Sequence, residues 1–179
     1  MALKREVFVH IISFLLFFFF ISLIKKWINL SYYSFWIGGL VGTMLPDIDH
    51  ILYVYLMRPY ELTSQRVTYE VNKRDFLRAF ALLSESRSER TNLVFHNFLF
   101  QIIFFILTFF VLSSSMNLLG RGIVIGFSLH LLIDQFIDLV TIDTINHWFT
   151  KFRFNLDRGQ AALYLVIGTI LVFGLSVIF

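Results

Sequence analysis

Long apolar runs separated by short polar segments dominate the pattern of this chain. Five stretches are apolar over nearly their whole length, namely 7–24, 34–57, 93–112, 120–140 and 161–179. Each has about the number of residues, roughly 17–25, that a helix needs to cross the hydrocarbon core of a bilayer. The pattern therefore predicts an all-α, polytopic integral membrane protein with about five transmembrane helices in a single membrane domain, residues 1–179.

The segment 58–92 is the only extended polar stretch. Within it, Phe76, Phe80 and Leu83 recur at helical spacing. Much of the opposite helix face is charged, with Lys73, Arg74, Asp75 and Arg78. This pattern suits either a helix lying in the membrane surface or a solvated helical loop. A second interfacial piece is predicted at 142–154, where aromatic residues alternate with basic ones.

Composition supports the membrane interpretation. Hydrophobic residues make up 58% of the chain and charged residues only 15%, against roughly a quarter in a soluble domain. A soluble fold of 179 residues has too little interior to bury so much apolar surface. There is no cysteine, which excludes disulfides and thiolate metal sites. We expect a membrane lipid or amphiphilic partner and no nucleic acid, with the oligomeric state left open.

The distribution of basic residues predicts an orientation. If the N-terminus is cytoplasmic, the cytoplasmic segments hold all but three of the 15 lysines and arginines. The three on the other side are Lys25, Lys26 and Arg121. Cytoplasmic loops of membrane proteins carry such an excess of positive charge. The sequence thus predicts a plasma (inner) membrane protein with its N-terminus in the cytoplasm and its C-terminus outside.

Ionisable side chains inside the predicted spans are the candidates for chemistry. They are His10, Asp47, Asp49, His50, His96, His130, Asp134 and Asp138. Each costs about 2.5–3.5 kcal/mol to insert at the centre of a bilayer, so each needs a compensating partner. Successive spans run in opposite directions, and this alternation places all eight in the same leaflet whichever way the protein is inserted. We predict a polar cluster near one face of the bilayer, around a metal.

Local spacing supports a metal site. His130, Asp134 and Asp138 are four residues apart and stack on one helix face. If Pro46 lies in the first turn of a helix, Asp47 and His50 also share a face. Imidazole and carboxylate ligands without thiolate favour a divalent ion, with zinc first and manganese or iron as alternatives. The predicted metal ligands are His10, Asp47, His50, His96, His130 and Asp134.

Two further carboxylates are assigned to catalysis. Asp49 or Asp138 would act as a general base, or as a carboxylate that orients a ligating histidine. Plainer explanations exist for single residues: His10 as an interfacial histidine, His96 as a polar contact between helices, and Asp138 as a solvated acid. His147 lies outside the spans and is expected at the surface.

At these motifs the chain resembles the YdjM-like family of membrane-bound metal-dependent hydrolases. The matching pieces are His10, the stretch 42–50 that reads Gly-x-x-x-Pro-Asp-Ile-Asp-His, His96, and the stretch 126–134 that reads Gly-x-x-x-His-x-x-x-Asp. The resemblance implies a helical membrane fold and metal-dependent hydrolysis. One feature departs from the family, whose members have a His-Arg pair shortly before the histidine that corresponds to His96. Here that first histidine is missing and Arg90 is only roughly in place.

Three functions follow from these observations. The first is a hydrolase acting on a lipid or amphiphilic (phospho)ester at the cytoplasmic face, with Arg90 contacting the substrate headgroup. The second is a non-catalytic membrane scaffold with a structural metal. The third is a transporter, which is disfavoured because the outer halves of the spans carry no ionisable residue to continue a polar path.

Overall fold

The computed structural model describes residues 2–86, 90, 93–152 and 154–179, and every element in these ranges is helical, as expected. The α-helices are α1 (Ala2–Lys25), α2 (Tyr33–Met44), α3 (Ile48–Leu52), α4 (Leu62–Asn72), α5 (Phe76–Glu85), α6 (Phe98–Ser114), α7 (Leu118–Thr141) and α8 (Arg158–Ile178). Two 3₁₀ turns, η1 (Leu30–Tyr32) and η4 (Asn146–Phe149), and a π-turn, η2 (Tyr53–Met57), lie between them.

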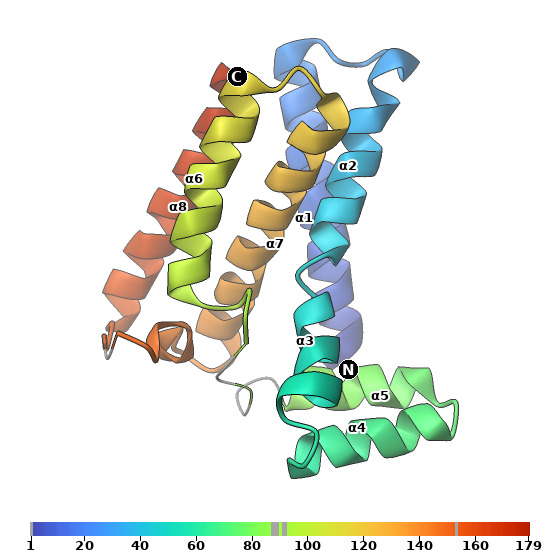
Figure 1. Ribbon diagram of the computed structural model, residues 1–179. Helices are drawn as coiled ribbons and strands as arrows, with labels where there is room; N and C mark the ends of the chain where they lie inside the picture. The colour runs from blue at the N-terminus through green and yellow to red at the C-terminus, as the bar shows by residue number, and fades with distance from the viewer. Residues whose placement is uncertain (1, 87–89, 91–92, 153) are drawn as a thin grey trace.

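Helix α7 forms the centre of the bundle. It contacts α1 and α2 on one side and α6 and α8 on the other (Figure 1). In its most apolar stretch 83% of the residues are buried, against 22% in α1 and 28% in α8. The outer faces of α1 and α8 instead expose large apolar side chains such as Phe8, Leu16 and Ile170. A helix buried all round belongs to the core, whereas apolar outer faces on its neighbours suit contact with lipid.

In the part of the chain that the structure describes, three helices are long and apolar enough to cross a membrane, namely Arg5–Lys25, Leu118–Thr141 and Arg158–Ile178. The predicted count of five is not reached, for two reasons. Helix α6 has only 17 residues, and the stretch 34–57 is not one helix. Pro46 has no N–H to donate to the carbonyl of Gly42, so α2 ends at Met44 and tighter turns follow before α3 and η2.

The predicted third span begins five residues late. Residues 93–97 are not helical, because their backbone N–H groups have other partners. Those of Val94, Phe95 and His96 donate to the carboxylate of Asp49, and Asn97 caps α6 by accepting from the N–H of Phe100.

Two pairs of glycines bring α2 and α7 into backbone contact. A Cβ atom on Gly38 would clash with the carbonyl of Leu119, and one on Gly42 with the carbonyl of Ile123. From the other side, a Cβ on Gly122 or Gly126 would clash with the backbone of α2. Such small-residue pairs four apart let membrane helices approach closely. The site motifs begin one turn beyond this contact, so the contact fixes the distance between them.

Helices α4 and α5 lie across one end of the bundle, beside the N-terminus (Figure 1). We call this the site end. Phe76, Leu77 and Phe80 of α5 are exposed, as an interfacial helix requires, whereas Leu83 turns inward to a small cluster with Val54. The predicted common face of Phe76, Phe80 and Leu83 is therefore divided. Residues 87–89 and 91–92 of the predicted polar segment lie outside the described part.

The second predicted interfacial piece is only partly at the surface, because its middle joins the core. Trp148 and Phe149 of η4 are only 2% and 3% exposed, and they pack under the site end of the bundle. Phe152 and Phe154 are exposed, as expected at an interface, while Arg153 is not among the described residues.

Candidate metal centre

The carboxylate of Asp134 on α7 is the meeting point of three imidazoles. Its Oδ1 lies 3.2 Å from Nε2 of His10, and its Oδ2 lies 2.8 Å from Nε2 of His96. Nε2 of His130, one turn earlier on α7, is 3.2 Å from the same Oδ2. Asp134 is only 2% exposed. Histidines from α1, from the segment before α6 and from α7 thus each direct Nε2 to the same buried carboxylate.

His10 is held with Nε2 pointing inward. Its Nδ1 lies 2.9 Å from the carbonyl oxygen of Glu6, one turn earlier on α1. A carbonyl oxygen can only accept, so Nδ1 carries the proton. In the neutral ring, Nε2 then presents its lone pair to Asp134, and the contact does not have hydrogen-bonding geometry.

His96 is oriented in the same way by a carboxylate. Its Nδ1 lies 3.2 Å from Oδ2 of Asp49 and its Nε2 lies 2.8 Å from Oδ2 of Asp134, so the ring sits between two carboxylates. In the tautomer with the proton on Nδ1, Asp49 accepts that hydrogen bond and Nε2 presents its lone pair toward Asp134. Histidines that bind metals almost always donate their other N–H to a carboxylate or a backbone carbonyl. His10 and His96 show one example of each.

Lone pairs of two neutral imidazoles that face one carboxylate repel each other unless a positive charge lies among them. That charge is either a second proton on the rings or a cation. One ligand atom each from His10, His130 and Asp134 lies within 4.8 Å of the others, a spacing that a single metal ion can bridge. Among the described residues, the buried ring nitrogens of His130 have no hydrogen-bond partner. The donor set therefore fits a divalent ion.

Asp47 lies at the edge of this group. Its Oδ1 is 3.6 Å from Nε2 of His130, and its side chain is 62% exposed. Its position in the turn after Pro46, across from α7, follows from the close approach of α2 and α7. Asp47 is thus within reach of the metal group and also of solvent.

Asp49 is fully buried and has four donors on its two oxygens. These are the ring of His96 and the backbone N–H groups of Val94, Phe95 and His96. A carboxylate so occupied stays ionised and has little capacity left to take a proton from substrate. Of the two roles expected for Asp49, general base or orienting carboxylate, the geometry fits the second.

His50 joins the group through ring contact. Its imidazole stacks on that of His96, with ring centroids 4.9 Å apart, and it is partly buried. The structure does not place it among the residues around Asp134 that are close enough to share one ion. Its role as a ligand stays a prediction.

Asp138 accepts hydrogen bonds from two residues of η4. Its Oδ2 accepts from Nε2 of His147 at 2.9 Å and from Nε1 of Trp148 at 2.8 Å, and the Trp148 ring packs on His96. His147 was expected at the surface, but its side chain is only 16% exposed. Local spacing could not indicate the pair of Asp138 and His147, because its members are nine residues apart with a turn between them.

Arg90, predicted to contact a substrate headgroup, lies in the structure at the end of α5. It is 3% exposed, and its guanidinium donates to the carbonyl of Leu83 and to the hydroxyl of Ser86. These contacts attach Arg90 to the last turn of α5. Contact with a headgroup stays a prediction.

Comparisons with family models, with curated proteins and with solved structures find no match to this chain. The site therefore rests on its own geometry.

Replacing Asp49 tests its orienting role. In Asp49→Asn the amide group cannot accept all four hydrogen bonds, so His96 loses its fixed orientation. We expect affinity for zinc to fall about 10- to 100-fold, the usual effect of losing such an orienting group. Competition with a chromophoric chelator measures this. Asp75→Asn, at the N-cap of α5 where asparagine caps equally well, should bind zinc like the wild type. Unchanged affinity in Asp49→Asn would contradict the role.

Proposed function

We propose that the protein is a membrane-embedded metal-dependent hydrolase that acts on a lipid or amphiphilic (phospho)ester at the cytoplasmic face. One observation carries this proposal: His10 and His96 each bind an acceptor through Nδ1 and direct Nε2 to Asp134, beside His130. This orientation is the one that metal-binding histidines adopt, and it supports the proposal.

His10, His130 and Asp134 lie close enough to share one ion, and His96, whose Nε2 faces the same carboxylate, would join them. Zinc is the first choice, with manganese or iron as alternatives. Catalysis would need one further position open to water or substrate, which closed structural sites lack. A divalent ion in this site would supply Lewis-acid polarisation of an ester and would lower the pKa of bound water toward neutrality.

The residues around this set have separate tasks. Asp49 orients His96, and Trp148 covers the His96 ring and excludes water from that side. Asp47 is the exposed carboxylate next to His130 and can accept a proton at its Oδ1 where substrate enters.

Membrane placement supports an amphiphilic substrate. The site is at the same end of the bundle as α4 and α5, where Phe76, Leu77 and Phe80 are exposed beside basic residues. Glu6 of α1 accepts from Ser84 of α5, which fixes this layer against the first helix. We place this end at the cytoplasmic surface of the inner membrane, with five crossings once the broken α2–η2 segment and α6 are counted.

Metal analysis together with hydrolysis assays tests the proposal. Protein purified in detergent should contain at least one equivalent of zinc, manganese or iron, and His130→Ala should contain much less. Wild type should hydrolyse at least one member of a panel of phospholipids and lipid phosphates, lose this activity on chelation and regain it with metal. Activity that persists after complete metal removal would contradict the mechanism. Metal that is retained without turnover would favour the structural scaffold, and absence of metal would mean that protons hold the cluster together.

A further inference from the structure

A cavity lies at the end of the bundle opposite the metal centre. We call this end the distal end. It has a volume of about 350 Å³ and is formed by the end of α1, the connection to α2 and the first turn of α2. Ser22 is about 18 Å along α1 from His10, at 1.5 Å per residue. This volume is at the lower end of the range of small-molecule sites, roughly 300–1,000 Å³.

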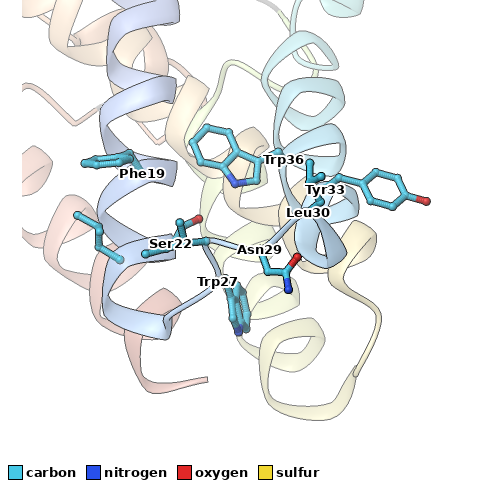
Figure 2. A pocket seen from close by; sticks show the side chains of 9 residues that line it. Phe19, Ser22, Trp27, Asn29, Leu30, Tyr33 and Trp36 are labelled. Atoms are coloured by element: carbon cyan, nitrogen blue, oxygen red, sulfur yellow. The ribbon is translucent and has the colours of Figure 1, made fainter.

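The lining is apolar and aromatic, with two polar side chains. Phe19, Trp27, Tyr33 and Trp36 provide much of the apolar wall (Figure 2). Ser22 and Asn29 are the polar members. Tryptophan and tyrosine concentrate where the hydrocarbon of a bilayer meets its headgroups, and this pocket lies where the apolar span of α1 ends.

The hydroxyl of Ser22 lacks a partner. Ser22 is 4% exposed, and its Oγ forms no hydrogen bond among the described residues. Several other hydroxyls on the helices, those of Thr43, Thr108, Thr141 and Ser176, donate to the carbonyl four residues earlier, whereas that of Ser64 on α4 also forms no such bond among the described residues. Figure 2 shows Ser22 on the side of α1 that faces Trp36 and Asn29, across the pocket. A buried polar atom that faces a cavity calls for a ligand atom to bind it.

Positive charge flanks the pocket. Lys25 lies with its Nζ 5.9 Å from the ring of Trp27, and Lys26 follows it in an exposed turn. The stretch 19–36 contains no acidic residue to neutralise them. The third cation at this end, Arg121, is occupied by the carbonyls of Leu112, Ser115 and Phe179. The two lysines are therefore the groups that can attract an anion.

We infer that this pocket binds one anionic glycerophospholipid from the leaflet at the distal end. The phosphate lies near Lys25 and Lys26, an ester carbonyl accepts from the Ser22 hydroxyl, and the first part of an acyl chain fills the aromatic pocket. The phosphate, the ester and the acyl chain of a lipid follow one another with increasing depth in the bilayer. Their partners here are the two lysines, the Ser22 hydroxyl and the aromatic wall, in that order. The inference is independent of the metal centre and of hydrolysis.

Quenching of tryptophan fluorescence by brominated lipids tests this inference. Trp27 and Trp36 line the pocket, and the third tryptophan, Trp148, is buried at the site end. Protein is placed in phosphatidylcholine vesicles with rising fractions of dibrominated phosphatidylglycerol, or of dibrominated phosphatidylcholine for comparison. We expect half-maximal quenching at a clearly lower fraction of the anionic lipid.

Three variants separate the contributions. Ser22→Ala should weaken binding of the anionic lipid about threefold to tenfold, the effect of one neutral hydrogen bond. Lys25→Gln/Lys26→Gln should lose the preference for the anionic lipid, at about fivefold per lysine. Ser176→Ala, a buried serine near the same end whose hydroxyl is already bonded, should match the wild type. Equal quenching by the two lipids, or wild-type binding by Ser22→Ala, would overturn the inference.

Discussion

Asp134→Asn should abolish both metal binding and hydrolysis. Asp134 is the one side chain that contacts all three converging imidazoles, and it is almost fully buried. Asparagine keeps the volume but removes the negative charge and one acceptor oxygen. Loss of an orienting group alone costs about 10- to 100-fold in metal affinity, so loss of this central ligand should cost more than about 100-fold. Elemental analysis and the hydrolysis assay measure the two losses.

The matched control is Asp143→Asn. Asp143 is an exposed aspartate at positive φ, a conformation that asparagine also adopts readily, and it pairs only with Arg158 at the surface. This variant should keep wild-type metal content and activity. If Asp134→Asn also keeps its metal, Asp134 is not a ligand and the metal is held elsewhere in the protein.

Gly42→Ala should destabilise the whole protein. The added methyl group would meet the backbone carbonyl of Ile123, which cannot rotate away as a side chain could. We expect a loss of about 3 kcal/mol, the upper end of the usual overpacking range. For a chain of this length that corresponds to a fall of roughly 6–12 °C in Tm. Metal affinity should fall too, because Asp47, in the turn that follows α2, and His130 of α7 lie immediately beyond this contact.

Gly174→Ala is the matched control for this substitution. Gly174 is also in a helix of the bundle, but nothing lies within 4 Å of the position of the added Cβ. Alanine should be neutral there or stabilise the helix by up to about 1 kcal/mol. Melting curves of the two variants in the same detergent measure the difference in Tm. Equal Tm values would mean that α2 and α7 do not pack through their glycines.

The local pattern of apolar residues was sufficient to predict the long helices. The spans predicted at 7–24 and 120–140 lie inside α1 and α7, and the one predicted at 161–179 lies inside α8 except for its last residue. These helices follow from runs of apolar residues, which need no knowledge of their neighbours. The prediction failed where another part of the chain competes for the backbone. Residues 93–97 are apolar enough for a helix, but the carboxylate of Asp49 takes their N–H groups.

The candidate site shows the same difference between what local sequence predicts and what tertiary contacts decide. Sequence alone determined a set of ionisable residues in apolar surroundings, because burying such groups without a partner costs too much free energy to be accidental. Only the tertiary structure decided their partners. Asp47 and Asp49 are two residues apart and alike in sequence terms, yet Asp49 is buried on His96 while Asp47 remains exposed beside His130.

Partner choice depends on distances between separate elements, and the packing of side chains and turns sets those distances. The glycine contact between α2 and α7 brings Asp47 to His130, and the turn through η4 returns His147 and Trp148 to Asp138. Neither distance is encoded in a local period of 3.6 residues. The sequence by itself thus determined a helical chain with a polar layer near one end, and the tertiary packing decided which histidines meet at Asp134.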